Sequence, residues 1–160
     1  MNNKNVITTT FDQFAKDLGG RKKSGSWYIT RPDSVVVLHL QKSNYGPRYY
    51  LNFGLWFLGI GPAQDPKPTH CHLQTRWENL VSETDRPHLE ALLDLDHSLM
   101  ENERNHDLLE ALKNWLVPFV DAGGTVSNLA TPIGQRLLAK SLLDGDGQKF
   151  LSKIRESLTY

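Results

Sequence analysis

Two strand-like segments separated by a turn constrain the fold of this chain more than any other feature. They run from Leu38 to Phe57 and flank the turn-rich residues 43–47, Ser-Asn-Tyr-Gly-Pro. This arrangement is typical of a β-hairpin. In the second segment, large apolar residues occupy every other position, namely Tyr49, Leu51, Phe53, Leu55 and Phe57. Because side chains alternate between the two faces of a sheet, one face is predicted to be core and the other polar.

The same reasoning predicts the remaining elements. Alternating residues indicate strands over 27–29, 35–42, 49–58 and 70–77. Helical spacing indicates helices in the regions 10–18, 86–100, 108–119, 131–142 and 150–158. Thr10 is expected to cap the first helix and Thr131 the fourth, where Pro132 follows as first helical residue. The order predicts one α+β domain over residues 1–160, an antiparallel four-stranded meander with helices packed on one face and a helical C-terminal half.

Composition limits where such a chain can work. The 39% content of hydrophobic residues suits a soluble core. The longest apolar run, residues 55–60, is far shorter than the ~20 residues that span a bilayer. The N-terminal residues lack the apolar core of a signal peptide, and the single cysteine excludes an internal disulfide. We therefore expect a cytoplasmic protein without a membrane partner.

The formal net charge of zero hides a strong segregation of charge along the chain. Residues 1–77 hold ten lysines and arginines against four acids, whereas residues 78–110 hold two against ten. Residues 111–160 hold six against four. Segregation of this kind affects the choice of partner and its electrostatic steering rather than the fold.

The acidic segment supplies the first set of candidate binding residues. Glu90, Asp94, His97 and Glu101 would line one side of a helix over 86–100, opposite its leucines. Like charges at i and i+4 destabilise a helix by about 0.2–0.5 kcal/mol per pair. A basic partner would relieve this repulsion, so such a row of acids suggests a cationic binding partner. The candidate residues of this segment are Glu83, Asp85, Glu90, Asp94, His97 and Glu101. The alternative is a solvated helix whose acids serve solubility.

The polar face of the predicted sheet supplies the second set. It would hold His39, Gln41, Tyr50, Asn52, Trp56, His72, Gln74 and Arg76. Aromatic residues beside an arginine are typical of a protein-interaction hot spot, and they also suit single-stranded nucleic acid. The candidate partner-binding residues on this face are Tyr50, Trp56, His72 and Arg76. An ordinary solvated sheet face would have a similar composition.

Catalytic and metal-binding patterns are weak. His70 and His72 share one face of the predicted strand, and His39 could join them as a zinc ligand in a metal-dependent hydrolase. The residues 144–147, Asp-Gly-Asp-Gly, begin like a calcium loop, but Arg155 stands where that loop requires a glutamate. We therefore predict no catalytic residue, no metal site and no cofactor.

Three segments carry a resemblance to a known family. They are FDQFAKDLGGRKKSGSWY, VVVLHLQKSNYGPRYYLNFGLWF and HCHLQTRWENL. In order and spacing they resemble the bacterial domain-of-unknown-function family 4304, over roughly residues 8–80. The resemblance implies an α+β fold and supplies no activity. Proteins of this kind also resemble the cargo of bacterial toxin–immunity loci, which implies a binding role.

The leading hypothesis is a non-enzymatic binding protein, specifically an immunity-type inhibitor of a basic toxin domain. The acidic segment would steer the cationic partner, and the aromatic sheet face or neighbouring loops would add short-range contacts. The alternatives are a hydrolase using His39, His70 and His72, and a binder of single-stranded nucleic acid. The negative balance of residues 78–110 disfavours nucleic acid.

Overall fold

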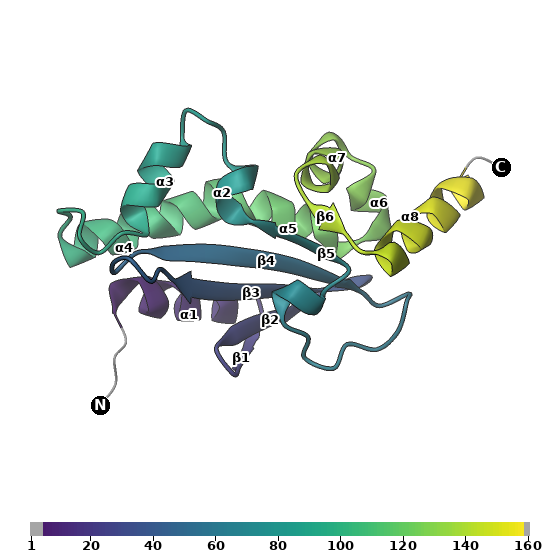
Figure 1. Ribbon diagram of the computed structural model, residues 1–160, viewed down its shortest axis with the longest axis horizontal. Helices are drawn as coiled ribbons and strands as arrows, with labels where there is room; N and C mark the ends of the chain where they lie inside the picture. The colour runs from purple at the N-terminus through teal and green to yellow at the C-terminus, as the bar shows by residue number, and fades with distance from the viewer. Residues whose placement is uncertain (1–4, 159–160) are drawn as a thin grey trace.

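A computed structural model describes residues 5–158 and contains one antiparallel sheet whose strands follow sequence order (Figure 1). The strands are β1 (Arg21–Lys23), β2 (Ser26–Thr30), β3 (Ser34–Lys42), β4 (Tyr49–Phe57), β5 (Leu73–Arg76) and β6 (Leu142–Leu143). The α+β class and the antiparallel meander are confirmed. The predicted number of four strands is wrong, because the described part of the chain forms six.

The two additional strands are short and lie at the edges of the sheet. β1 pairs with β2 through the two-residue loop Ser24-Gly25, whose φ angles of 51° and 82° are both positive. Such angles are what a tight type I′ hairpin turn requires. β6 pairs with β5 because the fourth predicted helix ends at Ala139 instead of continuing to Leu142. Runs of three and two residues are too short to show a strand period in the sequence.

The central hairpin agrees with its sequence pattern. β3 and β4 pair over their full length, with Leu38 opposite Phe53 and His39 opposite Asn52. The apolar set faces the helices and is fully buried except for Tyr49 at its start, which is half-buried; Leu38 and Phe53 are 0% exposed. The predicted division of the sheet into a core face and a polar face is therefore confirmed for the part that carries His39 and Asn52. Elsewhere on that second face, Tyr28, Val35 and Val37 form a smaller apolar cluster with Cys71.

Most helices pack on the core face of the sheet and share one hydrophobic core with it. The α-helices are α1 (Val6–Asp17), α2 (Trp77–Leu80), α3 (Arg86–Leu92), α4 (Glu101–Ala111), α5 (Val117–Gly124), α6 (Val126–Leu129), α7 (Pro132–Ala139) and α8 (Gly145–Leu158). In Figure 1, α4 and α5 run behind the sheet, and the single turn η1 (Pro68–His70) lies in front of it. Over residues 5–158, none of the helices combines the length and the apolar character needed to span a bilayer.

The first helix begins earlier than predicted. Asn5 is its N-cap and accepts a hydrogen bond from the Thr8 backbone N–H at 3.1 Å. Thr10 is buried inside the helix, where its hydroxyl donates to the Val6 carbonyl at 2.6 Å. The same hydroxyl accepts from the Asn105 side chain at 2.8 Å, which ties α1 to α4. Thr10 therefore serves helix packing rather than capping.

The helix predicted over 86–100 is shorter than expected: α3 ends at Leu92, and a non-helical connection leads to α4, which begins at Glu101. After Leu92 the chain leaves the helix and pairs with the hairpin turn. Tyr49 N–H donates to the Leu93 carbonyl at 2.9 Å, and Leu95 N–H donates to the Pro47 carbonyl at 3.0 Å. Leucine spacing could not reveal this pairing, because the partner lies more than forty residues away in the sequence.

The next predicted helix is continuous but locally widened. A π-helical turn, η2 (Leu112–Leu116), joins α4 to α5 just before Pro118. Proline has no N–H and its ring clashes with the carbonyl four residues earlier, so an extra residue in the turn relieves the conflict. The Trp77 indole N–H donates to the Trp115 carbonyl at 3.2 Å. Trp77, which is 0% exposed, thus anchors the π-turn to the core.

Candidate functional site

The exposed part of the polar face carries most of the side chains predicted for it. The residues that share this face and keep some exposure are His39, Gln41, Tyr50, Asn52, Gln74 and Arg76. They come from three neighbouring strands, β3, β4 and β5. For these residues the predicted geometry is confirmed.

Two members of the predicted face, Trp56 and His72, pack against each other near the end of β4. Trp56 is half-buried, and His72 is the last residue of the loop that connects β4 to β5. His72 is 3% exposed, and its Nδ1 accepts a hydrogen bond from the Phe57 backbone N–H at 3.0 Å. Its ring centroid is 4.1 Å from that of Trp56, whose indole N–H donates to the Gly61 carbonyl at 2.8 Å. Burial lowers the pKa of His72, which favours the neutral ring. Predicting His72 as an exposed contact was therefore wrong. Strand alternation does not reveal that His72 precedes β5, packs against Trp56 and lies beside the start of α8, where the Asp144 N–H donates to its carbonyl at 2.9 Å.

The three histidines considered as zinc ligands do not form a site. His70 lies in η1 and is exposed, whereas His72 is buried. Among residues 5–158, no three histidine, cysteine, aspartate or glutamate side chains are placed to hold a metal ion. Burial raises the pKa of the Cys71 thiol to about 12, so the thiolate form is disfavoured at neutral pH. The geometry gives no support to the hydrolase alternative.

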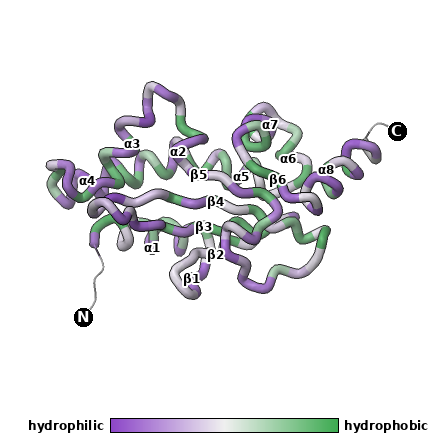
Figure 2. The backbone as a smooth tube through the Cα atoms, viewed as in Figure 1, coloured by the Kyte–Doolittle hydropathy of each residue, from purple (hydrophilic) through white to green (hydrophobic). Residues whose placement is uncertain are grey.

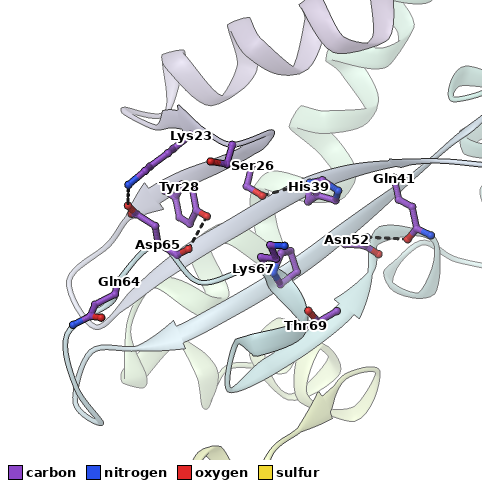
Figure 3. A pocket seen from close by; sticks show the side chains of 12 residues that line it. Lys23, Ser26, Tyr28, His39, Gln41, Asn52, Gln64, Asp65, Lys67 and Thr69 are labelled. Carbon is purple, nitrogen blue, oxygen red and sulfur yellow. Dashed lines mark hydrogen bonds and ion pairs between the residues drawn. The ribbon is translucent and has the colours of Figure 1, made fainter.

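A groove crosses the exposed part of the polar face. It consists of two cavities of about 550 and 590 Å³, which share Gln41, Asn52 and Thr69. The first is bounded by the β1–β2 hairpin and the loop 64–69 (Figure 3). The second is bounded by β5 and the segment 139–142. We refer to both cavities together as the sheet groove.

Arg76 is held in the sheet groove by uncharged partners. Its Nε donates to Asn52 Oδ1 at 3.4 Å, and its Nη2 donates to Gln41 Oε1 at 3.2 Å. Its guanidinium carbon lies 4.7 Å from the centroid of the Tyr50 ring. Within the described residues, no carboxylate lies within ion-pair distance of Arg76. The groove therefore presents an oriented cation.

The far rim of the first cavity is fixed by an ion-pair cluster. Asp65 accepts from Arg21 and from Lys23, the latter at 2.9 Å. The Tyr28 hydroxyl donates to the Asp65 carbonyl at 3.0 Å (Figure 3). The hydrogen bond from Arg21 holds the pKa of the Asp65 carboxyl below its usual value. These contacts attach the loop to the β1–β2 hairpin, so the groove is already formed without a ligand.

The acidic segment does not form the predicted ridge along one helix. Glu90 belongs to α3, whereas Asp94 and His97 lie in the connection that follows. Glu101 is the first residue of α4. The i, i+4 spacing of Glu90 and Asp94 places them on one face only within a continuous helix, and α3 ends at Leu92, before Asp94. The surface of residues 83–110, here called the acidic end, lies instead where α3 and α4 meet, at the left of Figure 1.

The two cations of this segment point inward. Arg86 donates to the carbonyls of Glu78 and Val81 at 2.9 and 3.3 Å. Arg104 is 2% exposed and donates to three carbonyls at the end of α3 and in the turn after it, at 2.7 to 2.9 Å. Neither arginine forms an ion pair with a carboxylate in the part of the chain that is described. The acidic end therefore keeps its negative charge.

The candidate acids of this surface have different local roles. Asp85 Oδ2 accepts from the Ser82 hydroxyl at 3.0 Å, and Asp94 Oδ1 accepts from the Asp96 N–H at 2.9 Å, so both stabilise turns. The side chains without such a role are exposed and form no ion pair with lysine or arginine among residues 5–158. They include Glu83, Glu90 and Glu101. Figure 2 shows hydrophilic residues along α4 and the connection before it.

One acid of the segment, Glu78, is buried instead of exposed. It is 9% exposed, and its Oε1 accepts from the Leu51 N–H at 3.4 Å. Its Oε2 has no hydrogen-bond partner among the described residues. Burial raises the pKa of this carboxyl, and the negative charge of Glu90 adds to the effect. The charge count of residues 78–110 includes Glu78 with the other acids of the segment, and the sequence does not reveal that it is buried.

We expect Glu78→Gln to stabilise the fold increasingly as the pH rises. Because the folded state binds the Glu78 proton more tightly than the unfolded state, stability falls from the unfolded pKa, about 4.3, up through the raised folded pKa. Glutamine resembles the protonated acid and removes this dependence. Urea unfolding of both proteins from about pH 4 to 8 measures the difference. A difference that stays constant over this range would show that the carboxyl titrates normally.

Comparison with known proteins identifies a family. Residues 11–122 match the family described as Domain of unknown function (DUF4304). The matched region contains β1 to β5 and the whole acidic end, so it extends well beyond the first half of the chain that carries the resemblance in sequence. No curated protein and no solved structure matches the chain. Because the match covers most of its length, the chain belongs to the DUF4304 family.

Proposed function

We propose that this chain is a non-enzymatic cytoplasmic protein that binds and inhibits a basic protein, as an immunity protein binds its toxin. The observation that carries the proposal is the unbalanced charge of the acidic end. Residues 83–110 hold nine acids and two arginines, and both arginines donate to main-chain carbonyls instead of pairing with the acids. A surface of this kind attracts a cationic partner over a distance of about one Debye length, roughly 8–10 Å in physiological salt.

Short-range contacts are available beside the acidic end. Tyr45, at the tip of the β3–β4 hairpin, is 98% exposed, and Met100, just before α4, is 65% exposed. The hairpin turn is tied to the acidic end by the backbone pairing of Arg48 with Asp94. Tyrosine is enriched at binding hot spots, and exposed methionine adapts to irregular surfaces. Tyr45 thus replaces the covered Trp56 and His72 as the aromatic contact of the proposal.

The structure weakens the nucleic-acid alternative. Bases need free aromatic faces on which to stack. Arg76 covers one face of the Tyr50 ring, and the rings of Trp56 and His72 pack against each other with their centroids 4.1 Å apart. Tyr28 is 4% exposed. The basic first half of the chain therefore lacks, among its described residues, the row of open aromatics that such a binder uses.

An affinity pull-down from a lysate of the native host tests the proposal. Three baits are compared: the wild type, the variant Glu83→Lys/Glu90→Lys/Glu101→Lys, and a matched control. The control, Asp17→Lys/Asp121→Lys/Asp146→Lys, makes the same charge change at exposed acids outside the acidic end. We expect a basic protein to be retained by the wild type and the control and lost by the first variant. Equal retention by all three, or retention by none, would contradict the proposal.

A further inference from the structure

The sheet groove has the opposite electrostatic character to the acidic end. Among its lining residues the one acid is Asp65, which is already paired with Arg21 and Lys23. Three lining cations, Lys67, Arg76 and Lys140, form no ion pair within the described residues. An unneutralised groove of this kind favours a ligand that carries negative charge.

Arg76 is positioned to receive a carboxylate. The two amide oxygens that hold it, from Gln41 and Asn52, fix its plane without cancelling its charge. Two of its five N–H groups are used in these bonds, so others stay free for a charge-assisted pair. The two amides are also bonded to each other, because Asn52 Nδ2 donates to Gln41 Oε1 at 3.1 Å. Because the arginine is already ordered, binding costs it little additional side-chain entropy.

The remaining lining groups suit a polypeptide backbone. Amides and hydroxyls both donate and accept hydrogen bonds, as peptide groups do, and the groove offers Gln41, Asn52, Thr69, Gln74 and Thr75. Leu142, at the β6 edge of the groove, is 72% exposed and can pack against an apolar part of the ligand.

We propose that the sheet groove binds an extended acidic peptide segment, with one of its carboxylates on Arg76 and another near Lys140. The choice of peptide over nucleic acid rests on the tyrosines of this face, because Tyr28 in the lining is 4% exposed and Arg76 already lies over one face of the Tyr50 ring, which leaves little room for base stacking. This site is separate from the acidic end and takes a partner of opposite charge. If the sheet groove does not bind an acidic peptide, the proposed inhibition of a basic protein by the acidic end is unaffected.

A fluorescent peptide of alternating glutamate and threonine, about eight residues long, is the probe for this site. At about 3.3 Å per residue it spans both cavities, and its glutamates share one side of the extended chain. Fluorescence anisotropy in physiological salt measures its affinity for the full chain. We expect saturable binding by the wild type, and no binding of the same peptide with glutamine in place of glutamate.

Single charge-removing variants locate the binding. Arg76→Gln and Lys140→Gln are expected to weaken the affinity about tenfold and about threefold. Lys113→Gln, which removes an exposed cation in η2 outside the groove lining, is the matched control and should bind like the wild type. Thermal melting confirms that each variant is folded. Equal weakening by Lys113→Gln would show diffuse charge attraction and overturn the proposal.

An oligothymidine of similar length provides the competing ligand. We expect it to bind at least tenfold more weakly than the acidic peptide. Absence of peptide binding by the wild type, or tighter binding of the oligothymidine, would overturn the assignment of the groove to an acidic peptide.

Discussion

Replacing Arg104 with methionine is expected to lower the free energy of unfolding by about 3 kcal/mol. The buried guanidinium donates to the carbonyls of Ala91 and Leu92, which end α3, and to that of His97. Carbonyls at a helix C-terminus lack partners within the helix, and a cation there also favours the helix dipole. Methionine fills a similar volume but removes all three donors. The Ala91 carbonyl still accepts from the Asp94 N–H at 3.3 Å, whereas the Leu92 carbonyl loses the donor of a buried hydrogen bond.

Urea unfolding of the wild type, Arg104→Met and Arg104→Lys measures the effect. Lysine keeps the charge but has one nitrogen, so it cannot reach all three carbonyls, and we expect it to recover less than half of the loss. Hydrogen exchange should also become faster in the turn 93–99. If Arg104→Met loses less than about 0.5 kcal/mol, the arginine does not hold the acidic end in place.

Alanine at Gly54 is expected to destabilise the fold by about 2 kcal/mol. A Cβ at this position would lie 2.8 Å from Cys71 Sγ and 3.1 Å from Pro68 Cα, so η1 would have to move away from β4. On an open strand the same change would be stabilising by about 0.5–1 kcal/mol, because glycine costs more entropy on folding. The sign of the effect therefore reports whether the loop covers this part of the sheet.

A second glycine provides the control for this experiment. A Cβ added to Gly46, in the hairpin turn, would have no other atom within 4 Å among the described residues, and no positive φ requires glycine there. Gly46→Ala should leave stability unchanged or slightly raise it. A stabilising effect at both positions would mean that η1 does not pack on β4, and the floor of the sheet groove would then be wider.

The elements with a long, regular pattern were predictable from the sequence. In β4 the core residues occupy every other position from Leu51 to Phe57, so the register with β3 follows from the turn and the apolar face together. The start of α7 was also predictable, because Thr131 accepts from the Gly134 N–H at 3.2 Å, as an N-cap before Pro132 does. In each case the information lies within a few consecutive residues.

The features that sequence reasoning missed depend on distant contacts. The break after α3 requires the hairpin turn as hydrogen-bond partner, and the inward orientation of Arg104 requires the carbonyls that this break exposes. His72 is buried because it packs against Trp56 and Phe57 and lies beside the start of α8, which is distant in the sequence. The candidate site changed accordingly: the acids Glu83, Glu90 and Glu101 stay on the surface, but as parts of three segments rather than one helix.

The most direct test of the central claim is the salt dependence of association between this chain and the basic protein captured by it. Stopped-flow rates are measured at about 50 and 200 mM salt for the wild type, the Glu83/Glu90/Glu101 charge-reversed variant and its matched control. For the wild type and the control, we predict rates that fall about tenfold over this range. The charge-reversed variant should associate more slowly at low salt and respond weakly to salt. Identical rates and salt responses for all three proteins would contradict a steering role for the acidic end.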